Sequence, residues 1–211
     1  MMRCDVLVPM KEIEQCKSRL SSMLSPAVRQ AVTQAMLEHV LLALSSAEGV
    51  REVTVVGGGL RLRDLSSAHG VHWIPAGGSG LNATLQEALK WALCLKPSIV
   101  GIVFGDLPFL RGEDVEGAIQ FLEKGRYDCV LAPDVVGTGT NGVFIRKSCF
   151  FRPCFGDRSY ERHRRDLLQR GFRVGTYRAG GFSRDVDTPQ DAFAAWPALR
   201  NCLKESVDVE I

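Results

Sequence analysis

Two acidic motifs in the chain are candidates for a divalent-metal site. The first follows the apolar run "SIVGIVF", which ends in Gly105, Asp106, Leu107 and Pro108. A carboxylate directly after a buried strand is costly unless it is paired, and Pro108 fixes the turn that follows it. Hard cations such as magnesium need carboxylate oxygens and bind beside phosphates. Asp106 is therefore predicted to be a metal ligand; the alternative is a carboxylate that caps its own turn.

The second acidic motif, "SRDVDTPQDAF", stands near the end of the chain. Asp185 and Asp187 alternate along it, so both carboxylates face one side of an extended backbone. Thr188 and Asp191 have the spacing of a helix capping box, and Asp187 could simply support that turn. Asp185 has no capping duty. It is predicted to be the second metal ligand, so that Asp106 and Asp185 would hold one or two magnesium ions against phosphate oxygens.

A cluster of cations follows the first apolar run, in the stretch "PMKEIEQCKSRL". Lys11, Lys17 and Arg19 stand in what is predicted to be a strand-to-helix loop, a type of loop that often holds phosphates. Such loops are usually rich in glycine, whereas this one contains none. It offers side-chain charge where other phosphate loops offer backbone amides.

Three further loops carry groups that suit an anion. A hairpin turn is the default explanation of "GTGTNGVFI", although the hydroxyl of Thr140 and a row of free amides would suit a carboxylate or phosphate. The segment "FGDRSYERH" puts Gly156 and Ser159 at a predicted helix start, where an anion could bind. In "GGSGLNATL", Gly80 precedes a helix expected to begin near Asn82. The exposed backbone amides at this helix start would bind the base or phosphate of a nucleotide. The alternative is a flexible turn in which Asn82 caps the helix.

The elements that must position these residues alternate along the chain. The predicted strands are rich in valine and isoleucine and lie within "VLVP", "EVTVVG", "VHWIP", "SIVGIVFGD", "DCVLAP", "NGVFIR" and "FRVGTYR". The predicted helices, with apolar residues three and four apart, cover 25–43, 60–69, 82–95, 112–124, 157–170 and 189 onward. This alternation predicts a three-layer α/β domain with a largely parallel sheet. In such sheets, ligands bind at the carboxyl ends of the strands.

The composition bounds the class of protein. The chain has 211 residues, 45% of them apolar, and a formal net charge of +2, which does not favour a nucleic-acid or membrane surface. We expect one domain over residues 1–211, with a tail from about residue 197 that has no assigned role. No signal peptide or membrane span is expected, so the predicted location is cytoplasmic. The cysteines, expected to be reduced thiols, are Cys4, Cys16, Cys94, Cys129, Cys149, Cys154 and Cys202.

Six motifs, in order along the chain, resemble those of the 2-phospho-L-lactate guanylyltransferase family, whose relatives act on phosphoenolpyruvate or 3-phosphoglycerate. They are "VPMK…KSRL", "GLNATL", "GDLPFL", "GTGTNGVFI", "FGDRSYERH" and "DVDTP", and the match covers residues 6–192. The resemblance implies a nucleotidyltransferase fold of the GT-A-like, Rossmann-like type with a mixed, mostly parallel sheet. It implies GMP transfer from GTP to a small three-carbon phospho-acid in coenzyme F-420 biosynthesis. Gly142 and Tyr160 depart from the family pattern, which has alanine and phenylalanine there.

The resemblance also implies roles for residues in each motif. The expected metal ligands for Mg²⁺ are Asp106, Asp185 and Asp187. The residues expected to act in catalysis near the GTP phosphates are Lys11, Lys17 and Arg19, together with Asp106. The residues expected to hold the phospho-acid are Thr140, Gly156 and Ser159. The expected nucleotide-binding residues are Gly80, Leu81, Asn82 and Pro108.

The implied reaction joins two anions, which accounts for cations in the first loop. The acceptor phosphate must attack the α-phosphorus of GTP, and positive charge reduces the repulsion and stabilises departing pyrophosphate. A phosphate near neutral pH is already deprotonated, so no general base is required. The histidines that therefore need no catalytic role are His39, His69, His72 and His163.

Other functions are open at this point. A cytidylyl or molybdopterin-type nucleotidyltransferase would normally carry a glycine-rich first loop. A GT-A glycosyltransferase would normally place its "DVD" motif in the middle of the chain, and a non-catalytic nucleotide-binding protein would be expected to lose a metal carboxylate. The sequence does not choose among the three phospho-acids. It also leaves the oligomeric state open, a homodimer included.

Overall fold

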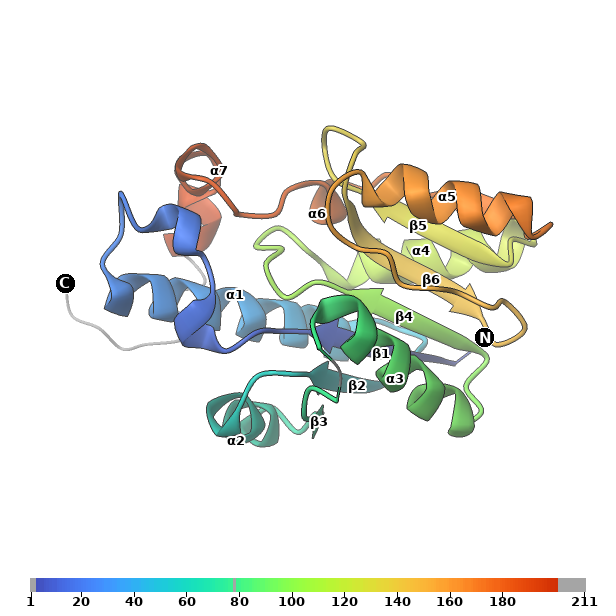
Figure 1. The fold of residues 1–211 in the computed structure, drawn as a ribbon, viewed down its shortest axis with the longest axis horizontal. Helices are drawn as coiled ribbons and strands as arrows, with labels where there is room; N and C mark the ends of the chain where they lie inside the picture. Colours follow the sequence, from blue (N-terminus) through green and yellow to red (C-terminus); the bar gives the residue numbers. More distant parts are fainter. Residues whose placement is uncertain (1–2, 78, 201–211) are drawn as a thin grey trace.

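A seven-stranded mixed sheet forms the middle of the protein (Figure 1). The structure is a computed structural model and describes residues 3–77 and 79–200. The strands lie in the order β3-β2-β1-β4-β6-β5-β7. Their bounds are β1 Cys4–Pro9, β2 Val50–Val56, β3 His72–Ile74, β4 Ile99–Val103, β5 Cys129–Pro133, β6 Thr140–Arg146 and β7 Val174–Thr176. All seven predicted strands are confirmed.

Only β6 among these strands runs against its neighbours. It pairs antiparallel with both β4 and β5, whereas every other pairing in the sheet is parallel. The predicted mixed, mostly parallel sheet is therefore confirmed. Because β1 and β4 are parallel neighbours, the loops that follow them leave the same edge of the sheet.

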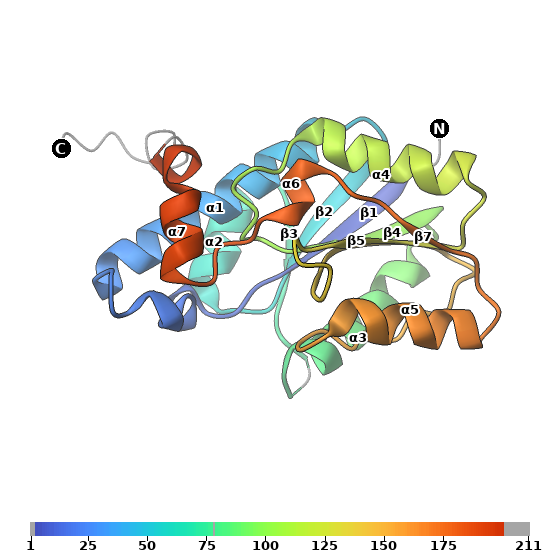
Figure 2. The same cartoon turned by 90° about the horizontal axis from the view of Figure 1, so that it is seen from above.

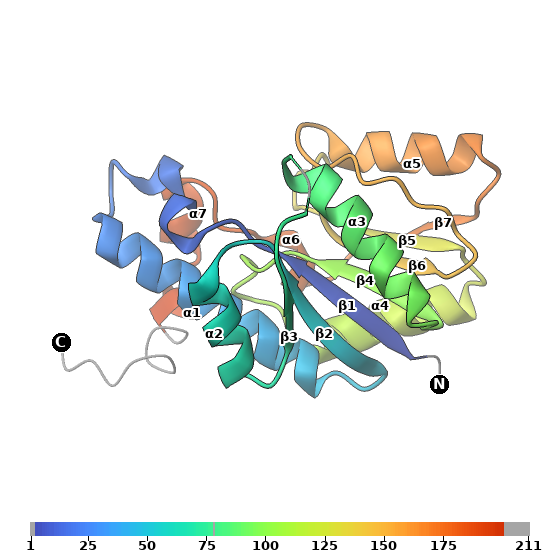
Figure 3. The same ribbon diagram turned by 60° about the horizontal axis from the view of Figure 1, so that its bottom comes forward.

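Helices cover both faces of the sheet, which confirms the three layers (Figure 2). One face is covered by α1 Pro26–Ser46, α2 Leu60–Ala68 and α4 Gly112–Lys124, and the other by α3 Leu81–Cys94 and α5 Ser159–Gln169. Figure 3 shows α3 lying across β1 and β4, while α5 lies over the end of the sheet formed by β5 and β7. A buried apolar core separates the sheet from each helical layer.

Local signals explain where two of the helices begin. The hydroxyl of Ser25 accepts the N–H of Val28, and Pro26 occupies the first turn of α1, as predicted. The last helix, α7 (Pro189–Ala194), begins with the predicted capping box between Thr188 and Asp191. A small third core packs α7 against the N-terminal half of α1, which brings the late acidic motif beside the first loop.

Several features differ from the sequence prediction or lie beyond it. The helix expected from residue 157 begins at Ser159, and the short helices η1 (Ile13–Gln15), η2 (Ser18–Leu20) and α6 (Gly180–Ser183) were not predicted. Residues 201–211, including Cys202 and most of the unassigned tail, lie outside the described residues. Cysteines elsewhere in the described ranges are free thiols. None of the helices described has the length and apolar character needed to cross a bilayer.

Packing explains why glycine stands at position 142, where the resembling family has alanine. A Cβ added there would lie 2.8 Å from the ring of Phe182 and 3.1 Å from the Cβ of Ala132. Phe182 belongs to α6 and is fully buried. An alanine at this position would therefore have to push α6 away from β6, and α6 directly precedes the late acidic motif.

Candidate active site

The predicted motifs meet in a cleft of about 710 Å³ at the carboxyl ends of β1 and β4. Segments far apart in the sequence contribute to it: the first loop, the loop after β4, the β5–β6 turn, the start of α5 and the segment between α6 and α7. The predicted residues that line it are Lys11, Lys17, Arg19, Leu81, Asp106, Thr140, Gly156, Ser159, Asp185 and Asp187. The cleft therefore holds residues from all six motifs.

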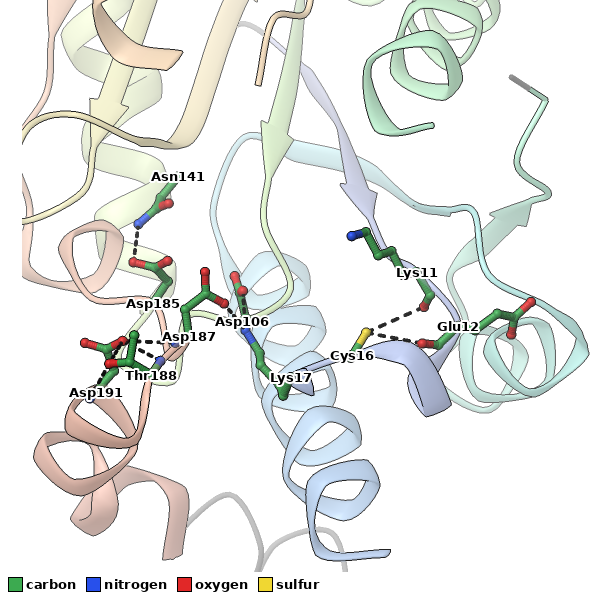
Figure 4. A network of polar contacts seen from close by, with 10 residues as sticks. All are labelled: Lys11, Glu12, Cys16, Lys17, Asp106, Asn141, Asp185, Asp187, Thr188 and Asp191. Atoms are coloured by element: carbon green, nitrogen blue, oxygen red, sulfur yellow. Dashed lines mark hydrogen bonds and ion pairs between the residues drawn. The ribbon is translucent and has the colours of Figure 1, made fainter. Parts of the chain in front are cut away.

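Three carboxylates line this cleft and lie close to one another (Figure 4). Oxygen atoms of Asp106, Asp185 and Asp187 all lie within 4.8 Å of one another. Asn141, at the start of β6, orients this group: its side-chain amide donates to Asp185 at 3.3 Å and to the Phe182 carbonyl at 2.9 Å. Alternation around Val186 thus places both late aspartates toward Asp106, as the sequence predicted.

Lys17 bridges two of these carboxylates. Its Nζ lies 2.6 Å from Asp106 and 3.0 Å from Asp187, and only 6% of its side chain is exposed. The residue adopts a left-handed backbone conformation with φ 55°, which is uncommon for a side chain other than glycine or asparagine. The turn before η2 therefore points the ammonium group at the acidic residues.

The charges in this group shift its acid–base equilibria. Burial would lower the pKa of Lys17, but attraction by Asp106 and then Asp187 outweighs it, so the pKa rises above its ordinary value. Burial acts to raise the pKa of Asp187, yet Lys17 holds that pKa below the usual range. Burial, followed by repulsion from Asp106, raises the pKa of Asp185. Of the three carboxylates, Asp185 alone forms no ion pair with a described residue.

This donor set fits a divalent cation. Oxygen ligands from three carboxylates are the type that magnesium prefers, and their spacing allows one ion to reach several of them. Asp185 is destabilised in its charged form by burial and by Asp106, so an added cation would relieve that repulsion. The three residues named as metal ligands from the sequence are thus brought together by the fold.

Replacing Lys17 with methionine tests the competition between its ammonium group and a metal ion. Without magnesium, the unpaired carboxylates should lower the free energy of unfolding by roughly 1–3 kcal/mol, between the values for exposed and buried pairs. Added Mg²⁺ should then raise the melting temperature of Lys17→Met more than that of the wild type. Lys11→Met is the control, because Lys11 lines the same cleft but forms no ion pair with a described residue. An equal magnesium effect in all three proteins would count against this arrangement.

Lys11 and Arg19 occupy the same cleft as exposed cations. Neither forms a salt bridge within the described ranges, although both contribute to the lowered pKa of Asp187. The loop that carries them packs against the end of β2 at Gly57, where a Cβ would lie 2.4 Å from the Met10 carbonyl oxygen. Because Lys11 and Arg19 are exposed and form no salt bridge with a described residue, their charges are available to an anionic ligand.

The β5–β6 turn differs from the prediction in one respect. It is a hairpin, as the default explanation had it, but its amides are not free. The carboxylate of Asp134 accepts the N–H groups of Gly137, Thr138 and Gly139 at 2.6, 2.9 and 2.9 Å. These backbone amides therefore bind the protein's own Asp134 carboxylate, which holds the turn in place beside the cleft.

Asn82 does not cap its helix. The helix α3 begins at Leu81 after Gly80, and the Asn82 side chain instead makes two hydrogen bonds with the backbone of Phe155. Its Oδ1 accepts the Phe155 N–H at 2.7 Å, and its Nδ2 donates to the Phe155 carbonyl at 3.1 Å. Asn82 therefore ties the start of α3 to the loop before α5. Gly80, Asn82 and Pro108 are not among the residues that line the cleft.

Thr140 and Ser159 both line the cleft, and their hydroxyl groups contact each other. Both are almost fully buried, and the Ser159 hydroxyl donates to the Thr140 hydroxyl oxygen at 3.3 Å. Gly156 lies in the loop just before Ser159 and has φ 116°, a conformation that favours glycine. Ser159 makes no side-chain cap to α5, so its hydroxyl is not explained by helix capping.

Sequence reasoning missed several residues of this cleft. Phe104, Asp134 and Asn141 line it, as does Thr33 from α1, whose buried hydroxyl has no hydrogen-bond partner among the described residues. Thr33 and Asn141 lie in predicted elements, and nothing in their local pattern separates them from core positions. His163, which the sequence analysis expects to have no catalytic role, does not line the cleft but contacts the Thr140 hydroxyl.

The fold and cleft define a class of protein. The structure resembles that of a nucleotide-diphospho-sugar transferase from Desulfovibrio desulfuricans G20, with a TM-score of 0.77 and 18% identity over all of both chains. It also resembles CMP:2-keto-3-deoxy-manno-octonic acid synthetase in complex with CTP, with a TM-score of 0.64 and 15% identity over 97% of this chain and 100% of that one. The fold is that of the nucleotidyltransferases.

Sequence comparison gives the family. The family model described as "Guanylyl transferase CofC like" matches residues 4–194, and the chain belongs to this family. A phosphoenolpyruvate guanylyltransferase of Thermobaculum terrenum is 31% identical over 90% of this chain and 81% of its own length. A 2-phospho-L-lactate guanylyltransferase of Methanopyrus kandleri is 35% identical, covering 90% and 89%. A 3-phospho-D-glycerate guanylyltransferase of Phenylobacterium zucineum is 38% identical, covering 83% and 82%.

Proposed function

We propose that this protein transfers GMP from GTP to the phosphate of a small three-carbon phospho-acid, with release of pyrophosphate, in coenzyme F-420 biosynthesis. The acceptor is 2-phospho-L-lactate, phosphoenolpyruvate or 3-phosphoglycerate, the three substrates in the names of its relatives. Family membership favours this reaction over cytidylyl or molybdopterin-type transfer, glycosyl transfer and nucleotide binding without catalysis. We place the reaction in the cytoplasm, where GTP is available.

One observation carries the proposal: a single cleft combines free cations, clustered carboxylates and paired hydroxyls. Lys11 and Arg19 supply positive charge that no described acid neutralises by an ion pair. Asp106, with Asp185 and Asp187, supplies the oxygen ligands that a triphosphate–metal complex needs. A site built in this way suits two anionic substrates, because each would meet charge or hydrogen-bond donors.

The chain's own residues act mainly by position and charge. Lys11 and Arg19 bind the triphosphate and oppose its repulsion of the incoming acceptor phosphate. Thr140 and Ser159, with the Gly156 backbone, orient the phospho-acid so that its phosphate oxygen points toward the α-phosphorus of GTP. Magnesium, when bound by the carboxylates, would neutralise phosphate charge and stabilise the leaving pyrophosphate.

No side-chain base is assigned, in agreement with the position of the histidines. His39 contacts the Leu110 carbonyl at 2.9 Å, and His72 contacts Glu52 on the surface. None of the four histidines lines the cleft. The acceptor phosphate, deprotonated near neutral pH, serves as the nucleophile itself.

Product analysis tests the reaction type. The protein is incubated with Mg²⁺, GTP and each of the three phospho-acids, and the products are followed by phosphorus NMR and mass spectrometry. We expect a pair of coupled phosphorus signals from a new diphosphate bond, together with a mass equal to GMP joined to the acid. Hydrolysis of GTP without such a product would contradict the proposal.

A further inference from the structure

A buried histidine stands behind the two hydroxyls of the proposed phospho-acid site. His163 lies on α5 and is fully buried, and its ring packs against those of Phe151 and Phe155 at centroid distances of 4.9 and 4.7 Å. Its Nδ1 lies 3.2 Å from the Thr140 hydroxyl oxygen. Its Nε2 accepts the backbone N–H of Cys154 at 2.9 Å. Both ring nitrogens are therefore engaged.

These contacts fix which nitrogen carries the proton. Burial, and then the charge of Arg162, lowers the pKa of His163 to about 4, so the ring is neutral at pH 7 and holds one N–H. The Cys154 N–H can only donate, so the Nε2 that receives it must be unprotonated. The ring proton consequently lies on Nδ1, which donates to Thr140.

Counting protons then shows what is left for a ligand. The connected groups, His163 Nδ1, Thr140 and Ser159, carry one proton each and share two contacts. The first contact uses the histidine proton and the second uses the Ser159 proton, so the Thr140 proton remains unused. With Nδ1 unprotonated, Thr140 would have to donate to the ring, and both hydroxyl protons would be consumed inside the protein.

We infer that His163 is a positioning residue of the acceptor site, whose Nδ1–H donates to Thr140 and so keeps a hydroxyl proton of the Thr140–Ser159 pair directed to an anionic oxygen of the phospho-acid. The donated hydrogen bond also polarises the Thr140 hydroxyl, which strengthens it as a donor to an anion. This inference rests on the proposed function, because it takes the cleft wall at Thr140 as the phospho-acid site.

Nitrogen NMR of the intact protein tests the tautomer without any substitution. Long-range proton–nitrogen spectra distinguish a protonated ring nitrogen from an unprotonated one. We expect His163 to show a protonated Nδ1 and an unprotonated Nε2 throughout pH 6–8. A protonated Nε2, or a doubly protonated ring in this range, would overturn the inference.

Two substitutions separate the two hydrogen bonds of the ring. His163→Gln can keep an acceptor near Nε2 for the Cys154 N–H but has no donor at the Nδ1 position. His163→Asn can place an amide donor near Nδ1 but loses the Nε2 acceptor. Loss of one net hydrogen bond corresponds to about five-fold in binding. We expect His163→Gln to raise the KM for the phospho-acid about five-fold, His163→Asn to raise it less, and the KM for GTP to change less than two-fold in both.

The outcomes distinguish this inference from the function on which it depends. Equal increases in both variants, or lower melting temperatures with unchanged KM values, would show that His163 is only structural. Thr140→Val serves as the reference. If Thr140→Val raises the acceptor KM and His163→Gln does not, the inference fails and the proposed site stands. If Thr140→Val has no effect on that KM, the phospho-acid binds elsewhere and the proposed site itself fails.

Discussion

Replacing Asp106 with asparagine is expected to lower kcat by far more than ten-fold while leaving the fold intact. The exchange is nearly isosteric, but it removes one of three carboxylates whose oxygens lie within 4.8 Å of one another. Asp106 follows β4, whereas the other two carboxylates, Asp185 and Asp187, come from the segment before α7. A magnesium ion held by this group would need the negative charge of Asp106. Steady-state rates in Mg²⁺, with circular dichroism and melting temperature alongside, measure both parts of the expectation.

The control for this variant is Asp64→Asn. Asp64 is an exposed aspartate of α2 that pairs with the neighbouring Arg63 and does not line the cleft. It should change neither kcat nor the response to magnesium. If Asp106→Asn kept more than about a tenth of the wild-type rate, a loss under 1.4 kcal/mol, Asp106 would not be an essential metal ligand.

Replacing Thr140 with valine is expected to raise the KM for the phospho-acid about ten-fold or more, and replacing Ser159 with alanine is expected to raise it less, with little change in the KM for GTP in either variant. Each change removes a hydroxyl from a buried pair that lines the cleft. A hydrogen bond to an ionised acceptor contributes roughly 1.5–3 kcal/mol, which corresponds to at least ten-fold in affinity. Kinetics with each substrate varied in turn, at saturating concentration of the other, measure the two KM values.

Thr176→Val is the matched control for a strand threonine. Its hydroxyl lies on β7 and hydrogen-bonds the Tyr160 hydroxyl at 2.7 Å, away from the cleft lining. It should cost stability without changing either KM. The same pattern in Thr140→Val and Ser159→Ala, with lower melting temperatures and unchanged KM values, would mean that these hydroxyls stabilise the hairpin and helix instead of binding a ligand.

The sheet and its helices could be predicted because their signals are local. Central strands such as β4 are buried on both faces, and their sequences read as short continuous apolar runs. Capping residues such as Ser25 and Thr188 mark the helix starts directly. The carboxylates were also found from sequence, since Asp106 ends a buried strand and Asp185 and Asp187 share one side of an extended segment.

The connections within the site could not be predicted, because they join residues that only tertiary packing brings together. Lys17 meets Asp106 across 89 positions and Asp187 across 170, and this depends on α7 packing against α1. The carboxylate of Asp134 accepts the backbone N–H groups of its own turn. The glycines and threonines of the turn do not indicate this contact in the sequence. The role of a histidine behind the cleft wall depends on which backbone N–H reaches its second nitrogen.

Pyrophosphate release, measured for GTP, ATP, CTP and UTP with each of the three phospho-acids in the presence of Mg²⁺, tests the central claim most directly. A cleft with free cations, clustered carboxylates and paired hydroxyls in a member of the guanylyl transferase family should give rapid release with GTP and at least one acid. Release should depend on both substrates and should be slower with the other three nucleotides. Equal or faster release with CTP, or no release from GTP with any of the three acids, would contradict the account.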